Sequence, residues 1–243
     1  MIISRKRQIP PTCIMIKSSS LEQCNSYKYL GIFIDKDLNW SAHIQYITKK
    51  VLKACGAMAK LRHCVDIDIL KNVYFSLVHS YIRYGLLIWG NASSSTLSPL
   101  YTAIHKVLRI MTFAPFGNID LNPIFEHLKI LNLDQIFSLE RGKFLYKLHN
   151  NLLPTNIGNY FEPDPFVNQH SYGLRSRTAN LPTRLVSRTK YAEKSFQFGG
   201  QHFWNQLPGY IKDSKSFIAF KKCYKQFLLE SDKNDEEDSL FTQ

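Results

Sequence analysis

Two consecutive segments with helical apolar periodicity, residues 38–64 and 66–89, constrain most strongly what this chain can fold into. In the first segment, apolar side chains recur mostly three or four positions apart, at Leu38, Ile44, Ile47, Val51, Leu52, Cys55, Met58 and Leu61. Basic residues stand between them, so the pattern predicts an amphipathic helix with a basic outer face. The second segment is apolar nearly all round, which predicts a long helix buried in the core of a helical bundle.

Flanking signals extend this into a mainly α fold with short N-terminal β-strands. The Ser98-Pro99 and Asn122-Pro123 pairs predict helix starts, and apolar periodicity predicts a further helix over 134–151. The predicted organisation is β-strands over 1–37, a helical bundle over 38–153, an extended basic arm or linker over 154–190, a helical region over 191–229 and an acidic disordered tail over 230–243.

The last predicted strand leads into a possible pair of metal ligands. Residues 29–34 are mostly aromatic or aliphatic and enclose Gly31, which predicts a strand with a bulge or a close backbone approach. Asp35 and Asp37 follow in a polar turn before the first helix. A DxD pair on an extended strand is one way to bind a metal ion, whereas aspartates at a helix start commonly cap free backbone N–H groups. Capping is the interpretation that we prefer.

The chain is strongly basic, with a formal net charge of +12. Six acidic residues lie in 230–243, so residues 1–229 carry 30 basic and 13 acidic side chains. Such a field attracts polyanions, which predicts an anionic partner.

Two groups of basic residues are the candidates for contacting it, the first on the predicted helix over 38–64 and the second in the predicted arm. They are Lys49, Lys50, Lys53, Lys60 and Arg62, and then Arg175, Arg177, Arg184, Arg188 and Lys190. Contacts to phosphates are one interpretation of both groups. A solvated helix surface and a simple connector are the alternatives.

The cysteines and the N-terminus predict an intracellular location, in the cytoplasm or nucleus. The five cysteines form no CxxC pair and lack zinc-finger spacing, as expected for free thiols in a reducing compartment. No secretory signal pattern is visible, and the apolar run 85–90 is too short to span a bilayer. We expect no membrane partner and no cofactor.

Four motifs stand in order along the chain. The first is Tyr29-Leu30-Gly31, an acidic turn, Trp40 and His43-Ile44; the second is Tyr81-Ile82-Arg83-Tyr84-Gly85 with Ile88-Trp89-Gly90. The third is Tyr172-Gly173-Leu174-Arg175-Ser176-Arg177, and the last combines Ser195-Phe196, Gly200, Trp204-Asn205, Leu207-Pro208, Ile211, Ser216 and Phe220-Lys221. Together they resemble the region that follows the palm in reverse transcriptases of non-LTR retrotransposons of the jockey and CR1 type. In the third motif, Leu174 stands where that family usually has threonine.

This resemblance implies a fragment of an RNA-directed DNA polymerase that comprises post-palm strands, a helical thumb and a C-terminal region. The family's palm motif, Tyr or Phe followed by Ala-Asp-Asp, does not occur in the chain. Two-metal nucleotidyl transfer needs such carboxylates, so we expect no catalytic residue and no enzyme activity from this chain alone. A palm and fingers segment would have to be supplied elsewhere.

The expected function is therefore binding of RNA, DNA or an RNA/DNA hybrid, because thumb helices in that family hold the template and primer. The alternative is an inert remnant of a decayed mobile element with no retained activity. A hydrolase that uses aspartate and histidine is a weaker rival, because the sequence shows no close cluster of acidic and histidine residues.

Overall fold

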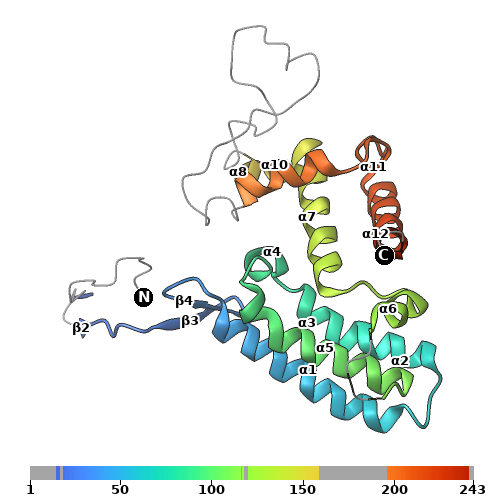
Figure 1. The fold of residues 1–243 in the computed structure, drawn as a ribbon. Helices are drawn as coiled ribbons and strands as arrows, with labels where there is room; N and C mark the ends of the chain where they lie inside the picture. Colours follow the sequence, from blue (N-terminus) through green and yellow to red (C-terminus); the bar gives the residue numbers. More distant parts are fainter. Residues whose placement is uncertain (1–14, 17–18, 116, 118–119, 159–195, 241–243) are drawn as a thin grey trace, which may run out of the picture. The chain divides into compact units, whose positions relative to one another are not determined.

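The computed structural model describes residues 15–16, 19–115, 117, 120–158 and 196–240, and Figure 1 shows its mainly helical architecture with a short β hairpin near the N-terminus. The chain forms two compact units, residues 1–133 and 134–243. The predicted fold class is confirmed. The bundle predicted over 38–153 crosses the boundary between the units, and the predicted arm lies outside the described residues except for 154–158.

Unit 1 begins with two short antiparallel strand pairs. Strand β1 (Met15–Ile16) pairs with β2 (Ser19–Ser20), and β3 (Ser26–Tyr29) pairs with β4 (Ile32–Asp35). The single strand predicted over 29–34 is wrong, because Leu30 and Gly31 form a two-residue turn with φ angles of 46° and 83°. Two consecutive positive φ angles suit a tight hairpin.

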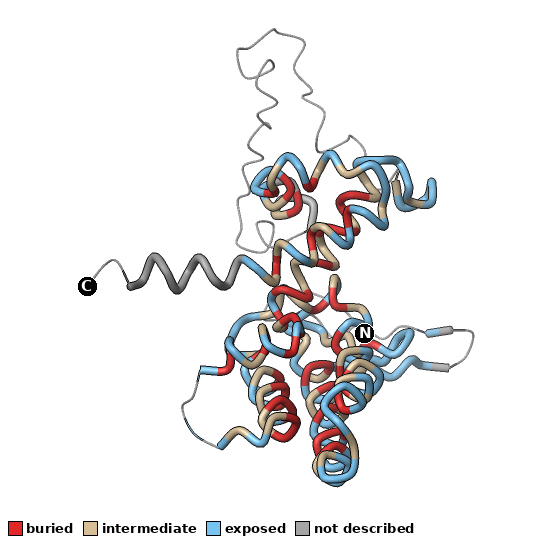
Figure 2. Tube along the Cα trace, turned by 90° about the vertical axis from the view of Figure 1, so that its right-hand side faces the viewer, coloured by how far each residue is buried: buried red, intermediate tan, exposed pale blue. Residues whose placement is uncertain are grey.

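Helices α1 (Ser41–Leu61) and α5 (Ser94–Thr112) pack along each other and form the core of unit 1 (Figure 1). Their C-terminal ends lie together, since the guanidinium group of Arg62 donates a hydrogen bond to the carbonyl oxygen of Ile110 (3.5 Å). The amphipathic pattern predicted over 38–64 is confirmed, and Figure 2 shows buried positions recurring along the helices. The buried residues of α1 are His43, Ile44, Ile47, Val51, Ala54, Cys55 and Met58.

The long helix predicted over 66–89 is divided into four pieces. These are α2 (Ile67–Tyr74), the π-helical turn η1 (Phe75–His79), α3 (Ser80–Arg83) and α4 (Leu86–Trp89). The break before α4 occurs because Tyr84 is extended (ψ 116°) and Gly85 is left-handed (φ 63°). The indole N–H of Trp89 donates to the carbonyl oxygen of Tyr84 (3.1 Å), which supports the break.

This segment is also less buried than the sequence predicted. One side carries buried residues such as Tyr74, Val78 and Ile82. On the other side Tyr81 is 38% exposed and Tyr84 55% exposed. An all-round apolar pattern therefore covers two different environments, which periodicity alone does not separate.

The start of α5 also differs from the prediction, because the helix begins at Ser94 and contains Pro99. The hydroxyl group of Ser93 accepts a hydrogen bond from the backbone N–H of Thr96 (3.3 Å), so the capping residue lies before the predicted one. Helix α6 (Asn122–Leu128) begins where the Asn122-Pro123 pair predicts.

Unit 2 comprises most of α7 (Leu133–His149), with α8 (Thr155–Gly158), α10 (Phe196–Gln206), α11 (Gly209–Lys212) and α12 (Phe217–Leu240). Aromatic residues form much of its core. Trp204, Phe220 and Tyr224 are buried, and the ring of Phe220 lies 4.5 Å from that of Tyr146 on α7. These aromatic side chains are therefore part of the packed core of unit 2.

Helix α12 continues to Leu240, whereas the sequence predicted a disordered tail from residue 230. Acidic composition argues against a packed core but not against a helix, because glutamate, lysine and leucine are good helix formers. No helix in the described ranges is both long enough and apolar enough to cross a membrane.

Candidate nucleic-acid interface

The exposed side of α1 carries a stripe of three lysines, Lys49, Lys53 and Lys60. At 3.6 residues per turn these positions fall within about 40° of one another, opposite the buried face of the helix. All three are exposed, and in the described part of the chain none of their ammonium groups forms an ion pair. We call these three residues the lysine stripe. Its charge is available to an external anion.

The surroundings of the stripe are poor in acidic residues. Between positions 38 and 119 the sequence has nine basic side chains and only two acidic ones, Asp66 and Asp68. Helices α1 and α5 contain no acidic residue at all. Few negative charges are therefore present in this segment to offset its positive charges. The resulting positive potential favours encounter with a polyanion.

Lys50 lies on the flank of α1, beside the stripe, and faces aromatic rings. Its ammonium nitrogen is 5.5 Å from the ring centroid of Tyr46 and 5.7 Å from that of Tyr81 on α3. The ammonium nitrogen of Lys28, on β3, lies 5.3 Å from the ring centroid of Tyr46. These distances fall within the range of cation–π attraction, which holds both cations near the aromatic groups.

Arg62 is not part of the stripe. It follows the last turn of α1, and its guanidinium carbon lies 4.4 Å from the ring centroid of Phe113. With its hydrogen bond to Ile110, this contact joins the ends of α1 and α5. Of the five predicted residues, the structure therefore brings Lys49, Lys53 and Lys60 together and places Lys50 beside them. Arg62 is directed towards the C-terminal end of α5 instead. Arg175, Arg177, Arg184, Arg188 and Lys190 lie outside the described residues.

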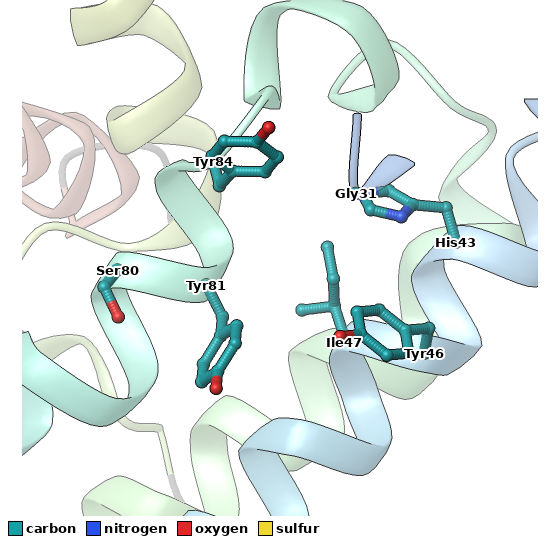
Figure 3. Close-up of a pocket in the computed structure, with 7 residues that line it drawn as sticks. All are labelled: Gly31, His43, Tyr46, Ile47, Ser80, Tyr81 and Tyr84. Atoms are coloured by element: carbon teal, nitrogen blue, oxygen red, sulfur yellow. The ribbon is translucent and has the colours of Figure 1, made fainter. Parts of the chain in front are cut away.

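A cavity of about 420 Å³ opens beside the stripe, lined by Gly31, His43, Tyr46, Ile47, Ser80, Tyr81 and Tyr84. Figure 3 shows the rings of Tyr46 and Tyr81 on opposite sides of this space, with Tyr84 above Tyr81 in the view. We call it the tyrosine cavity. It is formed by the β3–β4 turn, the flank of α1 and the exposed side of α3, all within unit 1.

His43 is the most buried polar side chain at this cavity, at 1% exposure. Its Nδ1 atom accepts a hydrogen bond from the backbone N–H of Phe33 (3.4 Å), while its Nε2 atom has no hydrogen-bond partner in the described structure. Burial lowers the pKa of His43 from 6.5 to about 4, so the ring is neutral at pH 7. A neutral imidazole that accepts at Nδ1 carries its hydrogen at Nε2, so His43 is a donor there.

The sequence does not predict the tyrosine cavity, because the apolar pattern of 66–89 predicts that the whole segment, with Tyr81 and Tyr84, is buried. Two signals point towards it: Lys50 follows Tyr46 by four residues, which places both on one helix face, and the surrounding sequence lacks acidic residues. Neither signal shows that α3 supplies the opposite wall.

Asp35 has the capping role that the sequence predicted. Its carboxylate oxygens accept hydrogen bonds from the backbone N–H groups of Asp37 (3.2 Å), Asn39 (2.8 Å) and Trp40 (2.7 Å). In contrast, Asp66 stands at the N-cap of α2 without a side-chain capping bond. Among the described residues, no group of three or more histidine, cysteine or acidic side chains is placed to hold a metal ion.

Comparison with known proteins shows what this chain is similar to. No protein-family profile matches it, and no solved structure matches it. It is 29% identical over 138 residues to an RNA-directed DNA polymerase from the mobile element jockey of Drosophila melanogaster, which covers 55% of this chain and 15% of the relative. It is also 29% identical over 111 residues to a probable RNA-directed DNA polymerase from the transposon X-element of the same species, and 26% identical over 106 residues to one from transposon BS.

These matches cover 44% and 42% of this chain, and 12% of each of those two relatives. The chain thus spans about one seventh of the length of the jockey relative that it matches.

Proposed function

We propose that this chain, whose relatives are RNA-directed DNA polymerases of jockey-type mobile elements, is a thumb and C-terminal region of such an enzyme that binds RNA or an RNA/DNA hybrid. It performs no nucleotidyl transfer by itself. Carboxylates that hold two metal ions would come from another segment, because the palm motif is absent from the sequence.

The lysine stripe is the observation that carries this proposal. Lys49, Lys53 and Lys60 lie on the exposed side of one helix, and no carboxylate in the part of the chain that the structure describes forms an ion pair with them. A row of ammonium groups on a helix suits the phosphates of a nucleic-acid backbone, which attract protein through charge with little dependence on sequence. Arg175, Arg177, Arg184, Arg188 and Lys190 are proposed as further phosphate contacts. Lys50 contributes from the edge of the stripe.

The test is binding of the purified chain to a labelled RNA/DNA hybrid across a salt series. The variant Lys49→Gln/Lys53→Gln/Lys60→Gln removes the stripe. The matched control, Lys215→Gln/Lys221→Gln/Lys222→Gln, removes the same charge from exposed positions of unit 2. Because each lost phosphate contact lowers the slope of log affinity against log salt by about 0.7 to 0.9, the stripe variant should lose roughly two units of slope and the control much less.

Equal weakening of both variants would show that net charge alone matters and would contradict a specific interface. No binding by folded wild-type protein at low salt would favour the inert remnant of a mobile element. A third variant, with Arg175, Arg177, Arg184 and Arg188 changed to Gln, tests the arm separately. When these changes are combined with the stripe variant, we expect the slope of log affinity against log salt to flatten further.

A further inference from the structure

The tyrosine cavity has the size and walls of a ligand site. Its volume of about 420 Å³ lies within the range of small-molecule pockets, and Tyr46 and Tyr81 lie on opposite sides of it (Figure 3). Aromatic side chains that line a cavity suit a flat aromatic ligand, because offset or edge-to-face contact of π systems adds to the burial of apolar area.

The lysines near the cavity favour a negatively charged ligand. Lys50 lies within 6 Å of both walls, and Lys28 approaches Tyr46 from the hairpin. Of the described residues that line the cavity, none is acidic. A flat group that carries a phosphate matches this combination of aromatic walls and ammonium groups.

His43 contributes to the cavity wall but offers no polar contact to a ligand. The residue lines the cavity, yet its Nε2 atom is itself buried and out of reach from the open space. The contacts available to a ligand are therefore the tyrosine side chains and the nearby ammonium groups.

We propose that the tyrosine cavity takes one unpaired nucleobase of the bound strand, packed against Tyr46 and Tyr81, with its phosphate beside Lys50. This rests on the proposed function, since the strand is held by the neighbouring lysine stripe. All four bases offer a π face, so the site prefers unpaired over paired nucleotides with little preference among bases. A paired base does not enter, because its faces are covered by its neighbours.

The experiment compares two labelled RNA/DNA hybrids that differ only by one unpaired nucleotide in the RNA strand. Wild-type protein should bind the hybrid with the unpaired nucleotide about tenfold more tightly, the order expected for one aromatic stacking contact. In a second readout, 2-aminopurine at the unpaired position should lose fluorescence on binding, because stacking quenches it.

Tyr81→Leu is the test variant, since this side chain is partly exposed and forms no hydrogen bond with any residue that the structure describes. It should abolish the tenfold preference and the quenching, while weakening the binding of the fully paired hybrid far less than the loss of the lysine stripe does. Tyr210→Leu, at an exposed tyrosine of unit 2, is the matched control and should keep both. A thermal melt of each variant shows whether it is folded.

The possible failures are distinguishable. Binding of both hybrids with equal affinity by wild-type protein would overturn the cavity proposal and leave the proposed function intact. Absence of binding to either hybrid would overturn both. Quenching of free 2-aminopurine riboside 5′-monophosphate at micromolar concentration would assign the cavity to a free nucleotide and contradict the strand as its ligand.

Discussion

Gly85 lies so close to Ile32 that a Cβ atom added to it would be 2.5 Å from the Cδ1 atom of Ile32. The backbone at Gly85, just before α4, is therefore packed directly against the side chain of Ile32 on strand β4. On the other side of the same junction, the hydroxyl group of Tyr84 donates a hydrogen bond to the carbonyl oxygen of Leu30. Tyr84 and Gly85, which separate α3 from α4, thus hold the β3–β4 hairpin against the helices. Gly31 of this hairpin forms one wall of the tyrosine cavity.

The first prediction concerns Gly85→Ala. The left-handed conformation (φ 63°) costs a non-glycine residue about 1 kcal/mol, and overpacking against Ile32 adds about 1–3 kcal/mol. We therefore expect the free energy of unfolding, measured with urea, to fall by roughly 2–4 kcal/mol. Gly56→Ala is the matched control: Gly56 lies in α1 with nothing within 4 Å of an added Cβ, so it should stabilise by about 0.5–1 kcal/mol. Equal effects of the two changes would contradict this close contact.

The second prediction separates capping from metal binding at the turn before α1. Asp35→Ala leaves three backbone N–H groups without their acceptor and should destabilise by about 1–2 kcal/mol. Asp37 is exposed, and Asp37→Ala should stay within about 0.5 kcal/mol of wild type. Thermal melts with added Mg²⁺ or EDTA should coincide for wild type, whereas a metal-dependent shift that either substitution removes would favour a metal site.

The third prediction is a pH dependence caused by His43. Its pKa is about 4 in the folded protein against an ordinary 6.5, so between these values the unfolded chain binds a proton that the folded chain does not. Stability should therefore fall as the pH drops from 6.5 to 4, by roughly 1.4 kcal/mol per pH unit within that window, and this contribution should level off below it.

Other groups titrate in the same window, so the measured quantity is the difference between wild type and His43→Gln. Glutamine can still accept from the Phe33 N–H group but does not titrate. The variant should lose up to about 3 kcal/mol less stability than wild type on going from pH 7 to pH 4. Parallel pH profiles of the two proteins would show that His43 is not buried in its neutral form.

The fourth prediction tests the core of unit 2. A Cβ atom on Gly142 of α7 would lie 2.6 Å from the Cε1 atom of Tyr224, a buried residue on α12. Gly142→Ala should therefore destabilise by about 1–3 kcal/mol, because overpacking exceeds the helix-propensity gain of about 0.5–1 kcal/mol. Gly209→Ala, where the nearest atom is 4.0 Å away, should be close to neutral. Similar losses at both positions would contradict tight packing of α7 on α12.

Much of the helical architecture follows from local sequence signals. The amphipathic pattern around Ile44 and Val51 defines α1, and the Asn122-Pro123 pair defines the start of α6. The failures have local causes as well. Ser93 caps α5 before the predicted start, and Leu30 with Gly31 turns the chain where a continuous strand was predicted. The cap and the turn both depend on local backbone conformations that several residue types can adopt. The spacing of apolar residues therefore does not show where the helix begins or where the strand turns.

The basic side of α1 was predictable for the same reason, since Lys49, Lys53 and Lys60 are placed on one face by helix geometry alone. The tyrosine cavity was not. Whether Tyr81 and Tyr84 are buried or face outward depends on which side of their helix packs against α1 and α5, and an all-round apolar sequence is compatible with either. By itself, the sequence determined helix type, the charge of α1 and the capping role of Asp35, because these follow from contacts within a few residues. Only the tertiary structure decided that Tyr46 and Tyr81 enclose one space and that His43 lines it, because those positions depend on packing between segments far apart in the chain.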